Sequence, residues 1–162
     1  MAHCVHSSQR ELDAIKRAGV YVVHCASSNE NLSSGYAYIR KMLNQNINVV
    51  LGSDIAGGDH ISMFDNVTST IRASKARNIM DEYNTPFLTV EEAFYLAISA
   101  ANSFFNEKPG FAVNSELHAI VLDESKLPRI RNLSIKERFE RAMYLRQEDA
   151  ITSVYSVGRK IK

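Results

Sequence analysis

With 162 residues, 45% of them hydrophobic, the chain is long enough for one domain with a sizeable core but too short for a closed (β/α)8 barrel, which takes about 250 residues. Nineteen lysines and arginines against eighteen acidic residues give a net charge of +1, which argues against nucleic-acid partners and polybasic membrane binding. The sequence has no apolar run of roughly 20 residues and only two cysteines, so we expect a cytoplasmic protein without a membrane span or a disulfide framework.

The first half of the sequence predicts helices and strands in alternation. Ser8 and Glu11 form a capping box that opens a helix, and Gly19 is its expected stop. In chain order we then expect a strand over 20–24, a polar loop over 27–35, a helix over 36–43, a strand over 48–52 and a helix that opens at 62. Purely apolar strands joined by helices predict a parallel α/β sheet that is covered on both faces.

The second half of the sequence is organised differently. Thr89 and Glu92 form another capping box, and the helix that they open is expected to stop at Pro109–Gly110. Beyond it we expect short strands over 111–113 and 118–122, a charged helix capped at Ser134, and a last strand over 151–157. This order differs from the regular alternation of strand and helix in the first half.

Ionisable residues at the carboxyl ends of three consecutive apolar segments form the candidate site. His3 lies in the first of these segments, His24 ends the second, and Asp54 follows the third. Parallel α/β sheets place their chemistry at this edge, and imidazole with carboxylate is a donor set that zinc or iron accepts. A functional role is favoured for Asp54, because a carboxylate at the end of a buried strand is costly unless it is paired or bound to metal. For either histidine alone, a satisfied core residue stays an open alternative.

Other reactive residues carry no such prediction. His6 and His60 lie in predicted loops, where solvated side chains are expected. Cys4 and Cys25 are expected to be small buried hydrophobes without an activated thiol. Gly57–Gly58 matches neither of the phosphate-binding motifs GxxxxGK[ST] and GxGxxG. It indicates a tight backbone just beyond Asp54.

Three blocks of the sequence resemble the amidohydrolase superfamily. They are Ala2–His3, then His24–Cys25 with Ser28–Asn29 and Leu32–Gly35, then Leu51–Asp54 with Ala56–Gly58. Their order and spacing are more specific than any one block, and within the superfamily they are most similar to the guanine deaminase branch. The similarity continues to the C-terminus. It implies an α/β fold, with about three βα units of a metal-dependent (β/α)8 (TIM) barrel over 1–108 and a β-rich segment of a small composite sandwich over 109–162.

The resemblance also implies a chemistry. Members of this branch are hydrolytic deaminases in which Zn²⁺, or Fe²⁺, activates water for attack on a purine, here most closely guanine, giving xanthine and ammonia. By position, Asp54 resembles the aspartate that ligates the metal and shuttles the proton of the water. His3 resembles the histidine that orients the hydroxide, and His24 and Asn29 match the block that lines the substrate pocket in a supporting role.

The departures from the family pattern are equally informative. The sequence has no His-x-His pair, and it lacks both the further histidine and the proton-shuttling glutamate that complete the family's site. Catalytic zinc sites have three protein ligands, so the metal site is expected to be incomplete in this chain. We expect open sheet edges that are covered by a missing N-terminal half or by a second copy of the chain. The alternatives are a non-catalytic binding or interaction module and adventitious metal binding by His3, His24 and Asp54.

Overall fold

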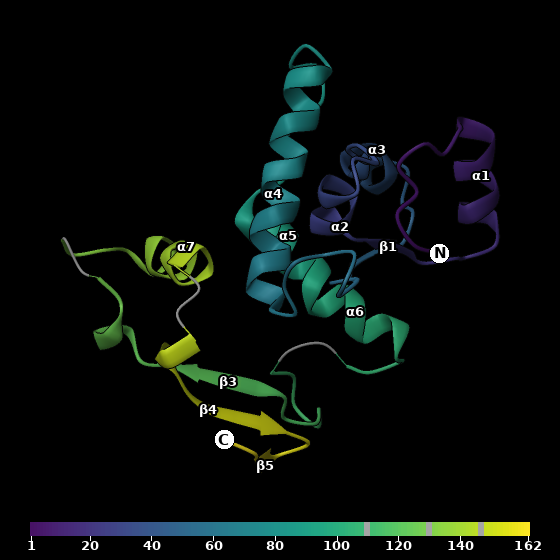
Figure 1. Ribbon diagram of the computed structural model, residues 1–162. Helices are drawn as coiled ribbons and strands as arrows, with labels where there is room; N and C mark the ends of the chain where they lie inside the picture. Colours follow the sequence, from purple (N-terminus) through teal and green to yellow (C-terminus); the bar gives the residue numbers. More distant parts are fainter. Residues whose placement is uncertain (109–110, 129–130, 146–147) are drawn as a thin grey trace.

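Two separate sheets and the helices around them make up the fold. The structure, a computed structural model, describes residues 1–108, 111–128, 131–145 and 148–162 (Figure 1). In chain order its elements are α1 (Gln9–Arg17), β1 (Val22–His24), α2 (Ala26–Asn31), α3 (Ile39–Asn44), β2 (Val49–Leu51), α4 (Met63–Met80), α5 (Val90–Ala97), α6 (Ser99–Phe104), β3 (Ala119–Leu122), η1 (Glu124–Lys126), α7 (Ile135–Leu145), η2 (Glu148–Ala150), β4 (Ile151–Ser156) and β5 (Arg159–Lys160). In the described part of the chain, no helix is both long enough and apolar enough to cross a membrane.

The first sheet is parallel, as the apolar runs predicted. β1 and β2 pair with Val22 opposite Val49, and Ala2 adds an isolated parallel bridge to Val23. The three segments therefore run side by side in one direction, and their carboxyl ends meet at one edge. Both strands are shorter than predicted, because pairing is confined to the residues that lie between the flanking helices and loops.

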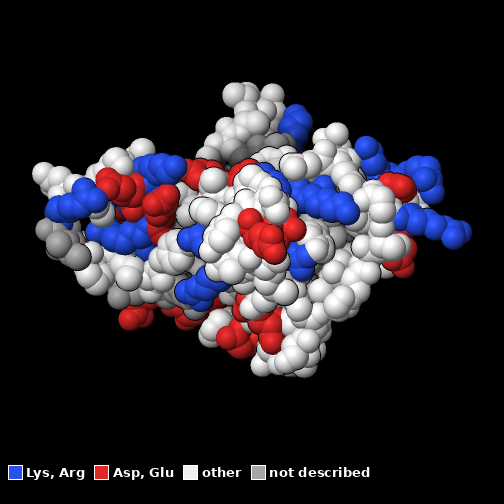
Figure 2. Space-filling view, turned by 90° about the horizontal axis from the view of Figure 1, so that it is seen from above, with Lys and Arg blue, Asp and Glu red and all other residues white. Residues whose placement is uncertain are grey.

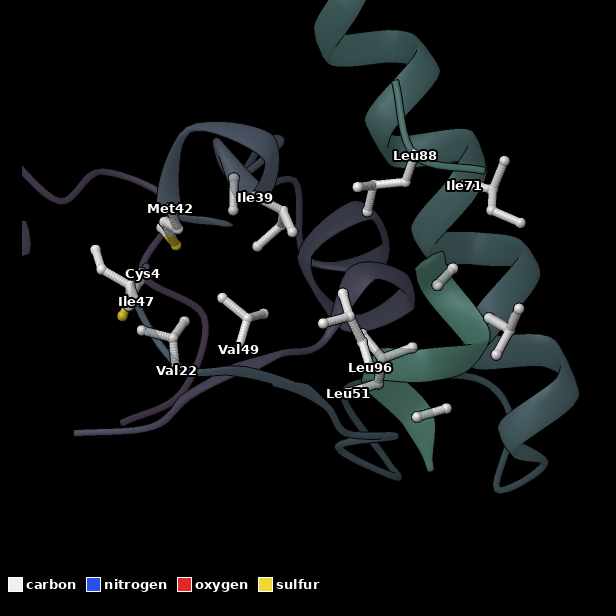
Figure 3. Packing of buried hydrophobic residues seen from close by; sticks show 14 of the residues in the cluster. Cys4, Val22, Ile39, Met42, Ile47, Val49, Leu51, Ile71, Leu88 and Leu96 are labelled. Atoms are coloured by element: carbon white, nitrogen blue, oxygen red, sulfur yellow. The ribbon is translucent and has the colours of Figure 1, made fainter. Parts of the chain in front are cut away.

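The main core lies between this sheet and the helices (Figure 3). α4 packs against α5 and α2, and α5 and α6 contact β2. The largest fully buried apolar side chains are Leu12, Val22, Met42, Val67, Ile71, Leu88 and Met143. Burying one such side chain stabilises the fold by about 1.5–3 kcal/mol, so this cluster is the principal source of stability.

The second sheet is antiparallel and lies away from the first (Figure 1). β3 pairs with β4, with Ala119 opposite Tyr155, and β4 continues through a tight turn into β5. The link to the first part is made by α7, which packs on α4 and places Phe139 edge-on to Phe94 at 4.9 Å between ring centroids. On the face shown in Figure 2, basic and acidic side chains lie among one another rather than in separate patches.

Two predicted elements differ from the structure in the type of element formed. Residues 27–31, expected in a loop, form most of α2, because Ser28 and Asn29 are buried and bonded on the face that points into the molecule. Tertiary contacts thus override the low helix propensity of serine and asparagine. The strand expected over 111–113 does not form: Phe111 and Val113 are 84% and 86% exposed, and they lie in turn geometry without a partner strand.

The helix opened by the Thr89 capping box is interrupted. Ile98 adopts φ −115° and ψ −74°, which divides the predicted helix into α5 and α6. The expected stop at Pro109–Gly110 lies outside the described residues, and α6 already ends at Phe104. The capping boxes themselves are confirmed at Ser8 and Thr89, since each side chain accepts a backbone N–H three residues on.

Candidate functional site

His3 and Asp54 come together at the carboxyl edge of the parallel sheet. His3 directly follows the bridge at Ala2, and its backbone N–H donates to the Val23 carbonyl at 2.9 Å. Asp54 lies just beyond β2. The Nε2 atom of His3 is 3.8 Å from Oδ2 of Asp54. This separation lets one small group contact both side chains.

Asp54 is accessible rather than buried. Its side chain is 41% exposed, as is that of His3, so both can be reached from solvent in this chain. The sequence-based prediction for Asp54 assumed a buried carboxylate with a free-energy cost, and this assumption is wrong because the side chain is exposed.

Both residues have backbone in the left-handed region. The φ angle is +66° at His3 and +47° at Asp54, and Ala56 in the same loop has φ +85°. For a residue with a side chain this costs roughly 1–2 kcal/mol, and such strain concentrates at functional sites. The Asp54 carbonyl is held by the N–H groups of Gly57 and Gly58, at 3.0 and 2.6 Å.

The helix α2 supplies a hydrogen bond to each member of the pair. Ser28 Oγ donates to Oδ2 of Asp54 at 2.6 Å, and Oδ1 of Asn29 lies 2.8 Å from Nδ1 of His3. Both side chains are buried, with 0% and 2% of their surface exposed. Sequence reasoning gave no role to Ser28, although its place beside Asn29 in the second block was a usable signal.

Gly57 closes the site next to this hydrogen bond. A Cβ atom at this position would lie 2.7 Å from Ser28 Oγ and 2.8 Å from Oδ2 of Asp54. Both distances are shorter than real Cβ atoms adopt, so the loop approaches the carboxylate only because residue 57 lacks a side chain. The tight backbone expected at Gly57–Gly58 is confirmed.

His24 and Cys25 are buried close to the site. Burial, with a smaller contribution from His3, lowers the pKa of His24 to about 4, so its ring is neutral near pH 7. Its Nδ1 atom is buried and has no hydrogen-bond partner among the described residues. Burial, with a smaller contribution from the Asp54 charge, raises the pKa of the Cys25 thiol to about 11. Cys4 and Cys25 are both buried, as the sequence predicted, and the Cys25 thiol is not activated.

The side chains present fit part of a metal site. Over 1–108, 111–128, 131–145 and 148–162, no group of three or more His, Cys, Asp or Glu side chains is arranged to hold a metal ion. The Asp54 carboxylate is accessible and fits as one ligand, whereas a catalytic zinc site needs three. Adventitious binding by His3, His24 and Asp54 together is therefore not supported, and further ligands must come from outside this set.

A hollow of about 540 Å³ lies elsewhere, between η1 and α7. Its lining includes Arg131, Arg138 and Glu124, and it shares no residue with the His3–Asp54 pair. Its arginines are bonded to carboxylates, with Arg138 Nη2 2.6 Å from Glu124 and Arg131 Nη2 2.5 Å from Glu137. The hollow is thus lined by arginines that are paired with carboxylates, and neither His3 nor Asp54 is among its lining residues.

Comparison with known proteins places these residues in a family. The chain matches the model of the Amidohydrolase family over residues 1–106. It is 36% identical to a guanine deaminase from Dictyostelium discoideum, over 100% of this chain and 37% of that protein. Among solved structures, guanine deaminase from C. acetobutylicum, with guanine bound in its active site, superposes with a TM-score of 0.95 at 40% identity and covers 100% of this chain.

A more distant structure shares the fold alone. An adenosine deaminase from Xanthomonas campestris with bound zinc superposes with a TM-score of 0.77 at 18% identity. The chain spans between 36% and 38% of the length of these three relatives, so it corresponds to a part of their amidohydrolase barrels. With more than half of its residues matched by the family model, the chain belongs to the amidohydrolase family.

Proposed function

We propose that this chain is the C-terminal portion of a cytoplasmic hydrolytic deaminase that converts guanine to xanthine and ammonia. The observation that carries the proposal is the accessible His3–Asp54 pair, with a 3.8 Å gap, in a chain that superposes at a TM-score of 0.95 on a guanine-bound guanine deaminase. The N-terminal part of the barrel would supply the other metal ligands. The proposal therefore concerns the assembled barrel.

The chemistry divides between the two accessible side chains. Asp54 would be one ligand of a divalent cation, Zn²⁺ or Fe²⁺, which when bound lowers the pKa of a water molecule toward about 7. The Asp54 carboxylate accepts the proton of the attacking water and returns it to the departing amine, so that the ring carbon gains oxygen and loses ammonia. His3 holds the attacking oxygen by a hydrogen bond from the other side of the gap. His24, neutral and buried, and Asn29 support the pocket wall.

The proposed domain division follows the two sheets. Residues 1–108 would form the barrel portion, and residues 109–162 the segment of a small sandwich. β2 has a neighbour on one side only among the described strands, and the same is true of β3. We propose that the N-terminal half of the barrel, or a second copy of this chain, covers these edges.

A chimera tests this function directly. In the C. acetobutylicum guanine deaminase, the segment that superposes on this chain is replaced by the 162 residues, and ammonia release from guanine and bound metal are measured. We expect turnover with stoichiometric metal. In the chimera, Asp54→Asn should lower kcat by about 10²–10⁴-fold, because the proton carrier is lost.

The matched control is Asp59→Asn. Asp59 is an exposed carboxylate in the same loop, bonded to Ser27 and near His60, and its loss should leave most of the turnover intact. A folded, metal-loaded chimera without activity on guanine would overturn the assignment, as would full activity of the Asp54→Asn variant. If the chimera folds but binds neither metal nor guanine, while the 162-residue chain pairs stably with a second copy of itself, a non-catalytic interaction module is the better description.

A further inference from the structure

Two consecutive side chains of α2 each hold one member of the His3–Asp54 pair. We propose that Ser28 and Asn29 are positioning residues, with Ser28 fixing the orientation of the Asp54 carboxylate and Asn29 fixing the imidazole of His3. The inference rests on the proposed function for the catalytic roles of His3 and Asp54. It adds the helix that sets their mutual geometry, which sequence reasoning placed in a loop.

The contact of Asn29 determines which nitrogen of His3 carries the proton. The Oδ1 atom of an asparagine can only accept, so Nδ1 of His3, 2.8 Å away, is the donor. In the neutral ring Nε2 then has a free lone pair, and it faces Oδ2 of Asp54 at 3.8 Å. Two acceptors then face one another across this gap, which is the arrangement that receives the two O–H groups of one water molecule.

The two polar atoms of the Asn29 amide differ in their contacts, and only the oxygen contacts His3. Nδ2 is buried and has no hydrogen-bond partner among the described residues, so half of the amide is unsatisfied. An asparagine retained only to stabilise the core would be expected to bond both groups. The side chain is instead placed so that its oxygen reaches His3.

Ser28 restrains the carboxylate from the opposite side. Its Oγ is fully buried and donates to Oδ2 of Asp54 at 2.6 Å, while Gly57 closes the space beside both atoms. The same helix is tied to the loop beyond Asp54, because Asn31 Nδ2 donates to the Gly57 carbonyl at 2.8 Å. α2 and the Asp54 loop therefore behave as one unit, and the carboxylate has little freedom to rotate.

Kinetics of the chimera separate positioning from packing. Ser28→Ala and Asn29→Leu should each lower kcat by about 10- to 100-fold, since the reacting groups are misplaced. Ser28→Ala should also leave KM within about twofold, because no substrate contact is proposed for Ser28. Ser28→Thr keeps the hydroxyl and should restore kcat to near that of the parent. Ser27→Ala is the matched control, because it makes the same change one residue earlier, where the hydroxyl bonds the exposed Asp59. If Ser28→Ala and Asn29→Leu lower only the melting temperature and leave kcat unchanged, the proposal is overturned.

A spectroscopic measurement tests the same idea without turnover. Long-range ¹H–¹⁵N correlation spectra of the chimera distinguish the two neutral imidazole tautomers of His3. We expect the Nδ1–H form in the parent and in Ser27→Ala, and a shift toward the Nε2–H form in Asn29→Leu. An unchanged His3 tautomer in Asn29→Leu would overturn the role of Asn29. If the parent chimera does not deaminate guanine, the proposed function fails, whereas these spectra still decide whether Asn29 fixes the ring.

Discussion

The two sheets of the molecule differ in how completely they are covered. In the parallel sheet, Val22 and Val49 are 0% and 2% exposed, and α3, α5 and α6 contact β2. In the antiparallel sheet, the neighbouring residues Ile120 and Val121 are 44% and 45% exposed. Successive side chains of a strand point to opposite faces, so β3 is open on both sides. The first region buries its own apolar core. The second sheet also has apolar strand residues, but in this chain they stay partly exposed to solvent.

The polar groups follow the same division. In the first region, Ser28, Asn29 and His24 are buried, and each lies at or next to the candidate site. In the second region, charged residues meet at the surface, as where His118 lies 3.7 Å from Glu116. Buried polar groups are costly unless they serve a specific contact, so this cluster supports the site proposed in the first region. The predictions below test whether the two regions differ as this comparison says.

The largest difference is expected in the pH dependence of stability. The pKa of His24 is about 4 in the folded chain and near 6.5 when unfolded, so the unfolded state takes up the proton first. Stability is therefore complete above about pH 6.5 and falls as the pH drops toward 4, by on the order of 3 kcal/mol from this group. Urea unfolding between pH 7 and 4 measures the loss, and His24→Leu should flatten the curve.

His118 is the matched histidine in the second region. Its side chain is 44% exposed, so His118→Gln should change the free energy of unfolding by less than about 0.5 kcal/mol. If the free energy of unfolding falls equally steeply with pH in the parent and in the His24→Leu variant, burial of His24 does not control the pH dependence of stability. Equal effects at both histidines would contradict the division into a covered and an open region.

The next effect compares one substitution on the two sheets. Val22→Ala removes fully buried methyl groups and should lower the free energy of unfolding by about 2 kcal/mol. Val121→Ala alters a half-exposed strand and should cost less than about 1 kcal/mol. Urea titration of both variants measures the difference, and a larger loss at Val121 would reverse the comparison. In the chimera, the cost at Val121 should rise toward that at Val22, because the added chain is expected to cover β3.

The elements that could be predicted from the sequence are those specified by neighbours along the chain. Ser8 with Glu11, and Thr89 with Glu92, fixed the starts of α1 and α5, since a capping box needs only residues three apart. The apolar runs located β1 and β2 for the same local reason. The element α2 could not be found this way, because its serines and asparagines are held by residues far along the chain. The break at Ile98 likewise has no local signal.

The carboxyl ends of the apolar segments located the candidate residues, and the order of the sequence blocks added the roles that the family resemblance implies. The ends of adjacent parallel strands explain why His3 and Asp54 meet, but the exposure of Asp54 depends on which chain segments cover the edge. The hydrogen bond from Ser28 requires knowledge that residues 27–31 are helical. The catalytic roles of these residues, and the substrate contacts of His24 and Asn29, stay predictions until the chimera is measured.

The smallest effect concerns matched helix caps in the two regions. Thr89 caps α5, whose Ala93 and Leu96 are buried against α4 and β2, so fraying its first turn disturbs the core. Thr89→Ala should therefore lower the free energy of unfolding by about 1 kcal/mol.

Ser134 makes the same capping box at α7, where its hydroxyl accepts the N–H of Glu137 at 3.3 Å. Among the described residues of that helix, however, only Met143 is buried. Ser134→Ala should open the first turn of α7 locally, seen as faster amide hydrogen exchange there, with less than about 0.5 kcal/mol lost globally. If the two substitutions lower the free energy of unfolding equally, α7 belongs to the core as firmly as α5. The antiparallel sheet would then be less independent of the first region than its exposure indicates.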